Sequence, residues 1–297
     1  MSSPPVPVPA TLAELLGDAE ALPPDERMTH FVHAARTREL RRLPGGARVV
    51  LSGGANADWY FDWFADSYPT PIERHIGVEF YLPVPEALPP GVEWLTRTLG
   101  DLGPVDDGSV DLAFAGQVIE HLWPHELAGF LREAHRVLRP GGTLCVDSVN
   151  RRVTLGIGWW YGEHTVELLP GEMRDLLLLA GFVDVEVRGV WLCAVPGGGP
   201  FMPLEIDAGD PDWPWRRRLE QAGEHPDDAF IWWITARRGE QAFPRDAVEA
   251  RVRELYRAAR PHYYARRLVA DGAVAEGGLA RRADGGGGPL VHGPYMA

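Results

Sequence analysis

Two histidines of this chain have neighbours that suit acid–base chemistry. His164 follows a run of aromatic residues and precedes Glu167 by three positions, so that carboxylate could orient its imidazole. His121 comes directly after Glu120, at the predicted start of a helix. Because histidine titrates closest to neutral pH, either ring could accept a proton from a substrate, with His164 the first candidate and His121 the second. A packed, hydrogen-bonded ring is the alternative, and for His121 we favour it.

Two further polar residues stand at the predicted carboxyl ends of strands. Glu79 lies at the end of a predicted strand and follows Gly54 by 25 positions, a spacing at which Rossmann-like proteins place an acid on ribose hydroxyls. Gln117 follows a predicted strand over residues 110–116. Because open α/β sheets bind ligands at this edge, we expect both side chains at a ligand site. An exposed strand-end carboxylate is the alternative for Glu79.

Strand-like segments alternate with helical ones along most of the chain. We predict strands at residues 49–51, 75–80, 92–95, 110–116, 143–149, 183–193 and 230–235. We predict helices at residues 11–21, 24–42, 127–138, 171–180 and 245–268. This alternation predicts the α/β fold class, with a mostly parallel sheet and helices on both faces.

The predicted organisation is one main domain with extensions at both ends. Residues 1–23 form an N-terminal extension, 24–240 the main domain, 241–276 a C-terminal helical extension and 277–297 a disordered tail. Within the main domain, residues 195–228 form a long insertion between two strands, rich in Gly, Pro and Trp. Long insertions often act as lids, so we expect this one to cover a binding site.

The composition excludes several classes of function. All 29 basic residues are arginine, so the chain has no lysine for a Walker P-loop or a pyridoxal Schiff base. The net charge of −13 argues against a nucleic-acid partner. Without a long apolar stretch or a secretory signal, we expect a cytoplasmic protein with no membrane partner. Neither cysteine has the neighbours of a zinc site, and we assign no metal ligands, so the sequence leaves open whether a general base or a metal is used.

The chain resembles the class I S-adenosylmethionine (SAM) dependent methyltransferases in four segments. Residues 107–122 (DGSVDLAFAGQVIEHL) and 136–144 (RVLRPGGTL) are similar to the family's fourth strand, the helix that follows it and the turn into its fifth strand. Residues 169–182 are similar to a later helix, and residues 225–233 to the start of the seventh, antiparallel strand. The resemblance implies a Rossmann-like sheet of seven strands, SAM as the cofactor and methyltransferase activity.

The resemblance also assigns residues to the SAM site. In the glycine loop after the first strand, Gly54 matches the family and follows Gly53, whereas Ser52 stands at the acidic position and Asn56 at the second glycine. Asn tolerates a left-handed backbone better than most residues, so the loop could still bind SAM. The resemblance implies that Glu79 binds the ribose of SAM and that Asp101 accepts from the adenine amino group. It also implies that the Leu102 amide contacts the adenine ring and that Gln117 contacts the methionine moiety or the substrate.

The acceptor of the methyl group is expected after the fifth strand. Asn150, followed later by His164, resembles family members that act on carbohydrates and natural products. We therefore expect transfer to an oxygen or nitrogen of a small acceptor, such as a sugar or a glycosylated natural product. The implied acceptor-binding residues are Asn150, Trp159, Trp160 and Tyr161. A catalytically silent protein of the same fold, which binds or regulates a partner, is the alternative that the altered glycine loop leaves open.

Overall fold

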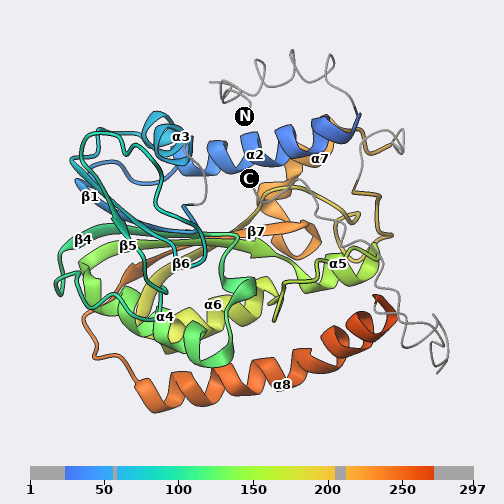
Figure 1. The fold of residues 1–297 in the computed structure, drawn as a ribbon. Helices are drawn as coiled ribbons and strands as arrows, with labels where there is room; N and C mark the ends of the chain where they lie inside the picture. The colour runs from blue at the N-terminus through green and yellow to red at the C-terminus, as the bar shows by residue number, and fades with distance from the viewer. Residues whose placement is uncertain (1–23, 56–58, 205–211, 271–297) are drawn as a thin grey trace.

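The computed structural model describes residues 24–55, 59–204 and 212–270. Its centre is a seven-stranded sheet with the strand order β3-β2-β1-β4-β5-β7-β6 (Figure 1). Neighbouring strands are parallel except where β7 pairs with β5 and β6. The predicted Rossmann-like, mostly parallel sheet is therefore confirmed. The strands are β1 (Val49–Gly53), β2 (Arg74–Val78), β3 (Val92–Leu95), β4 (Val110–Gly116), β5 (Leu138–Val149), β6 (Phe182–Gly189) and β7 (Ile231–Arg238).

Helices form a layer on each face of this sheet (Figure 1). One layer contains α2 (Pro24–Arg41), α3 (Tyr60–Ser67) and α7 (Trp215–Gln221). The other contains α4 (Pro124–Val137) and α6 (Pro170–Leu179), and α8 (Arg245–Ala270) packs on the outer side of these two helices (Figure 1). Because both faces are covered, the central strand β4 is apolar and buried from Leu112 to Ala115. The shorter elements are α5 (Arg151–Gly156), η1 (Ile119–His121), η2 (Ala222–Glu224) and η3 (Pro226–Asp228).

Three of the described helices, α3, α5 and α7, were not predicted from the sequence, whereas α8 was predicted and only its packing is new. Helix α3 was not predicted, since its sequence YFDWFADS contains aromatic residues of modest helix propensity. Helix α8 contributes Val248, Val252 and Leu255 to the core that the sheet shares with α4 and α6. The described part of the predicted C-terminal extension is thus part of the main core.

Some predicted segments lie outside the described residues. These are the helix at 11–21, the loop residue Asn56 and the tail at 277–297. Among the helices that are described, none combines the length and the apolar character needed to cross a membrane.

Candidate active site

A cavity of about 680 Å³ lies at the carboxyl ends of the parallel strands. Gly54, Glu79 and Gln117 line it. Each is the first residue after a strand: β1, β2 and β4, respectively. Carboxyl ends of parallel strands meet at one edge of the sheet, which is where open α/β sheets bind ligands. The cavity therefore joins three of the residues predicted to bind the cofactor.

The glycine loop shows why Gly54 matches the family pattern. Its φ is +70°, and a Cβ at this position would lie 2.6 Å from Cγ2 of Val118. Both the backbone conformation and the space therefore require glycine. Ser52, at the family's acidic position, is buried in β1 with its hydroxyl 2.7 Å from Nε2 of His75 on β2. Ser52 thus joins two strands, and Gly53 ends β1 with its Cα against Leu99.

Glu79 lines the cavity immediately after β2. Its Oε1 accepts hydrogen bonds from the backbone N–H groups of Phe80, at 2.8 Å, and Tyr81, at 2.7 Å. These two bonds fix the carboxylate while the side chain stays partly exposed to the cavity. An ordered carboxyl acceptor at this place is what two vicinal hydroxyls of a ribose would require.

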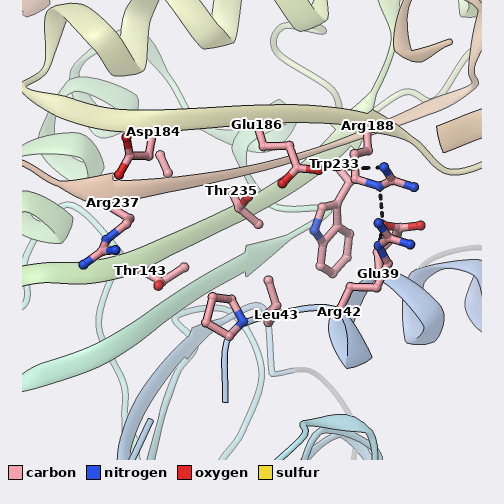
Figure 2. A pocket seen from close by; sticks show the side chains of 12 residues that line it. Glu39, Arg42, Leu43, Thr143, Asp184, Glu186, Arg188, Trp233, Thr235 and Arg237 are labelled. Atoms are coloured by element: carbon pink, nitrogen blue, oxygen red, sulfur yellow. Dashed lines mark hydrogen bonds and ion pairs between the residues drawn. The ribbon is translucent and has the colours of Figure 1, made fainter. Parts of the chain in front are cut away.

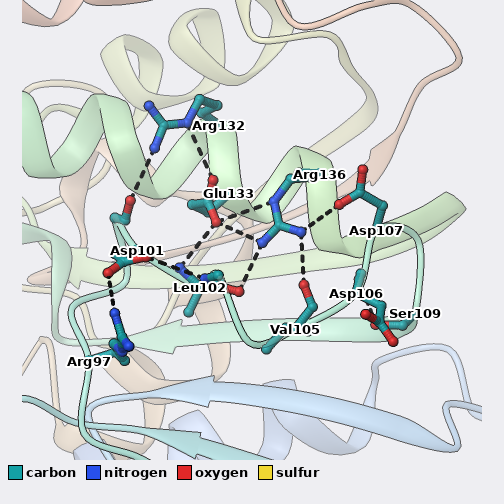
Figure 3. A network of polar contacts seen from close by, with 12 residues as sticks. Arg97, Asp101, Leu102, Val105, Asp106, Asp107, Ser109, Arg132, Glu133 and Arg136 are labelled. Atoms are coloured by element: carbon teal, nitrogen blue, oxygen red, sulfur yellow. Dashed lines mark hydrogen bonds and ion pairs between the residues drawn. The ribbon is translucent and has the colours of Figure 1, made fainter.

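The loop after β3 requires a correction at two predicted positions. The N–H of Leu102 donates to Oε2 of Glu133 at 3.1 Å, and Arg136 binds both that carboxylate and the Leu102 carbonyl (Figure 3). The Leu102 amide is therefore already used and cannot serve a ligand ring. Asp101 does not line the cavity, and its carboxylate forms an exposed ion pair, 2.6 Å long, with Arg97. The loop residues that do line the cavity are Arg97, Thr98 and Leu99.

Gln117 lines the cavity and has an unusual backbone conformation. Its φ is +55°, a region that non-glycine residues rarely adopt. The N–H of Gln117 donates to Oδ1 of Asp147 at 2.8 Å, and the same carboxylate accepts from Nε of Arg36 at 2.5 Å. Asp147 is fully buried on β5, and although burial opposes the charge of Arg36, this carboxylate raises its pKa above the ordinary value. A buried ion pair between α2 and β5 thus positions Gln117.

Sequence reasoning missed several residues of this cavity. Trp59, Tyr60 and Trp63 line it from the start of α3, and Arg36 reaches it from α2. The run WYFDWF at residues 59–64 was the available signal, because such a dense aromatic cluster in one turn must pack against something. Arg36 gave no signal, since its partner Asp147 lies 111 positions away.

The far end of the cavity is lined by Tyr161, Glu163 and Thr165, which follow α5. Tyr161 was predicted to contact the acceptor, and Trp159 stacks behind it with ring centroids 6.4 Å apart. Trp160 is partly buried and does not belong to the lining. Asn150 requires a correction, because it is fully buried and caps α5 through its Oδ1. Its Nδ2 donates to carbonyls of the 226–229 segment, so this side chain has a structural role.

The two histidines predicted for acid–base chemistry lie side by side at this end. The ring centroids of His121 and His164 are 4.8 Å apart, and Nδ1 of His164 lies 2.9 Å from Oε1 of Glu167, as the spacing suggested. His121 lines the cavity, whereas His164 is buried behind it. Burial raises the pKa of the adjacent Glu120 to about 7 and lowers the pKa of His121 to about 4.

Comparison with known proteins identifies the family to which this chain belongs. The sequence model of the methyltransferase-domain family matches residues 65–146. A protein of Mycolicibacterium smegmatis, named a probable S-adenosylmethionine-dependent methyltransferase, is 33% identical over 184 residues, which cover 58% of this chain and 68% of that protein. This chain belongs to the SAM-dependent methyltransferases.

Two other relatives match shorter stretches of this methyltransferase. A probable SAM-dependent methyltransferase of Mycobacterium tuberculosis is 44% identical over 105 residues, 34% of this chain and 37% of that protein. A malonyl-[acyl-carrier protein] O-methyltransferase of Dechloromonas aromatica is 34% identical over 100 residues, 31% of this chain and 37% of that protein. The expected enzyme class and the SAM cofactor are thereby confirmed.

The methyltransferase has a second hollow, of about 400 Å³, on a different part of the sheet. Trp233 and Thr235 of β7 line it beside Glu39 and Arg188 (Figure 2). Glu39 is only 1% exposed and accepts from Arg188 at 2.7 Å, so its charge is compensated within the protein. This hollow lies away from the carboxyl ends of β1, β2 and β4, and we assign it no role in SAM binding.

The insertion between β6 and β7 packs against the methyltransferase core in its described part. Trp215 stacks on Phe31 of α2 with ring centroids 4.3 Å apart, and Arg218 is buried with its Nε donating to the Leu192 carbonyl at 2.7 Å. Described residues of 195–228 do not belong to the lining of the large cavity. The predicted lid over the acceptor therefore has no support from these residues, and 205–211 lie outside the described chain.

Proposed function

We propose that this enzyme transfers the SAM methyl group to an oxygen or nitrogen of a small acceptor that occupies the outer half of the large cavity. The observation that carries this proposal is the continuity of the cavity from Gly54 and Glu79, at the strand ends, to His121 and Tyr161. SAM already carries an activated methyl group, so the protein has mainly to align acceptor, carbon and sulfur and to exclude water.

The SAM half of the cavity is the part nearest the strand ends. We assign the ribose to Glu79, the close backbone approach to Gly54 and the adenine ring to the surface formed by Thr98 and Leu99. The methionine moiety lies near Gln117 in this arrangement. Tryptophan faces from α3 could also attract the sulfonium charge, since an aromatic ring is negative on its face.

Replacing Glu79 by Ala should weaken SAM binding by about tenfold or more. A hydrogen bond to a charged group contributes about 1.5–3 kcal/mol, and Glu79 offers its carboxylate directly to the cavity. Calorimetric titration with SAM measures the effect. Glu73→Ala is the matched control, because it removes an exposed carboxylate at the other end of the same strand region, and it should leave SAM affinity unchanged. If both variants bind SAM with the same affinity, Glu79 does not bind the ribose.

The electrostatics of the lining favour a neutral or cationic acceptor. Glu79, Glu126 and Glu163 contribute carboxylates, whereas both arginines of the lining, Arg36 and Arg97, are already paired with aspartates. A phosphorylated acceptor would meet repulsion here without a free cation from the lining. The stacked rings at Tyr161 offer a flat apolar surface that suits a sugar ring or the aglycone of a glycosylated product.

The proton of the acceptor would leave near His121 and His164. Nδ1 of His164 is bound to Glu167, so Nε2 is the atom of this ring that could act as the base. His121 is the second candidate and is the one that lines the cavity.

A screen for acceptors tests the proposal. Purified enzyme with SAM is incubated with neutral glycosides, phenols and amines, and with phosphorylated sugars as a matched set, while S-adenosylhomocysteine is quantified. Product with members of the first set and none with the second supports the proposal. SAM binding without product from any small acceptor would instead favour the silent binding protein.

A further inference from the structure

We propose that Glu120, His121 and His164 together bind a divalent transition-metal ion at the acceptor end of the cavity. Among the residues that the structure describes, one ligand atom from each of these three lies within 4.8 Å of the others. Ligands about 2.1 Å from a tetrahedral ion are about 3.4 Å apart, so small side-chain rotations would close the site. Two imidazoles and one carboxylate are a known ligand set of catalytic zinc, which keeps a fourth position open.

Two of these side chains present unpartnered atoms to the site. Glu120 is 1% exposed, and its Oε2 accepts from the Ser148 hydroxyl at 2.8 Å while Oε1 has no hydrogen-bond partner. Nδ1 of His121 lies 3.3 Å from the carbonyl oxygen of Glu163, and Nε2 has no partner. Because a carbonyl can only accept, Nδ1 carries the hydrogen and Nε2 presents a lone pair.

His164 is oriented in the same way by a buried carboxylate. Its Nδ1 lies 2.9 Å from Glu167, whose other oxygen accepts from the Thr154 hydroxyl. A histidine that donates its second nitrogen to a carboxylate is the usual arrangement around a metal, because it fixes the ring and strengthens the ligand. Each of the three residues is therefore held through one polar atom and offers the other.

A bound cation would give a partner to both unpartnered atoms of the cluster. A buried polar atom without a partner costs about 1–3 kcal/mol, and the cluster contains two such atoms. Imidazole nitrogen favours zinc, iron, copper or nickel over magnesium or calcium, so the ion is a transition metal.

Such an ion would act on the acceptor itself, and this part of the inference rests on the proposed function. Because His121 lines the cavity, an acceptor in the cavity could reach an ion bound beside it. A hydroxyl bound there loses its proton to solvent more readily, as metal-bound water does. The hydroxyl oxygen then bonds to the methyl carbon of SAM as the C–S bond breaks. The electron pair of the C–S bond stays on sulfur, and S-adenosylhomocysteine forms. The ion would take the place of a histidine base.

Metal binding can be measured without any acceptor. Untagged enzyme is treated with a chelator, dialysed, and titrated calorimetrically with Zn²⁺ and separately with Mg²⁺. We expect one Zn²⁺ per chain with a Kd of about 1 µM or lower, and Mg²⁺ binding at least about 100-fold weaker. Co²⁺ added to the wild-type protein should give the visible absorption of a tetrahedral site, a result that does not depend on any variant folding.

Variants locate the ion within the protein. Glu120→Gln, His121→Gln and His164→Gln should each weaken Zn²⁺ binding by about 100-fold, and Glu167→Gln by about 10–100-fold because it acts through His164. His135→Gln is the matched control, since His135 is also buried with an unpartnered Nε2 but lies on α4 against Phe182. It should bind Zn²⁺ as the wild type does.

Two results would overturn the proposal. One is wild-type protein that binds neither Zn²⁺ nor Co²⁺ below about 1 mM. The other is unchanged Zn²⁺ affinity in folded cluster variants that match His135→Gln. Failure to find an acceptor would count against the proposed function and leave the metal measurement unaffected.

Discussion

Replacing Asp147 by Ala is expected to lower the free energy of unfolding by about 3–5 kcal/mol, because it leaves the Arg36 guanidinium without its partner in a largely buried place. The Asp147 side chain is fully buried, and the Arg36 side chain is 14% exposed. The same substitution removes one of the two acceptors of the Gln117 N–H and leaves only the Asp147 backbone carbonyl, at 3.0 Å, to hold its left-handed conformation. The structure therefore predicts a loss of stability together with weaker SAM binding.

Urea denaturation followed by circular dichroism measures this loss. Glu93→Ala is the control, because Glu93 forms a comparable 2.7 Å ion pair with Arg74 in which both side chains are about half exposed. Solvent screens that pair, and its loss should cost about 0–1 kcal/mol. A cost below about 1 kcal/mol for Asp147→Ala as well would mean that the buried pair contributes no more than a surface pair.

Replacing His164 by Ala should lower kcat by about 100-fold or more while SAM affinity stays the same. His164, in the segment after α5, lies beside His121, whereas Gly54 and Glu79 follow β1 and β2. The loss follows whether the ring accepts the acceptor proton directly or holds an ion that makes the acceptor more acidic. Single-turnover kinetics with saturating SAM measure kcat, and calorimetry measures the SAM affinity.

His125→Ala is the matched control for this variant. His125 is exposed near the start of α4 and does not belong to the cavity lining, so kcat should not change. If folded His164→Ala loses less than about threefold in kcat, the histidine has a binding or structural role and catalysis comes from alignment alone.

The sheet could be predicted from the sequence because its signals are local. The strand at residues 110–116 was predicted with the bounds that β4 has, since a buried parallel strand is a continuous apolar run between turn residues. β5 begins earlier than predicted, at Leu138, because the glycine turn after Arg139 belongs to the paired strand. Short local patterns do not reveal where such a pairing starts.

The proximity of active-site residues that lie far apart in the sequence could not be predicted. Glu120 and His164 are 44 positions apart, and nothing near either residue indicates that both meet at one point. Asn150 shows the opposite error, because a polar residue after a strand matched the family pattern although its amide is used to cap α5. Motifs place residues at the correct edge of the sheet, but the neighbours of each side chain decide which of them remain available to a ligand.

Helix α8 has a consequence for anyone who shortens this protein. The Tyr256 hydroxyl donates to the Leu122 carbonyl at 2.5 Å, and Leu122 lines the large cavity one residue after His121. Ala259, further along the helix, is 1% exposed. Ending an expressed protein after β7 would therefore remove α8, and with it the hydrogen bond that supports Leu122 in the lining of the large cavity. Crystallisation trials should trim only what lies beyond this helix.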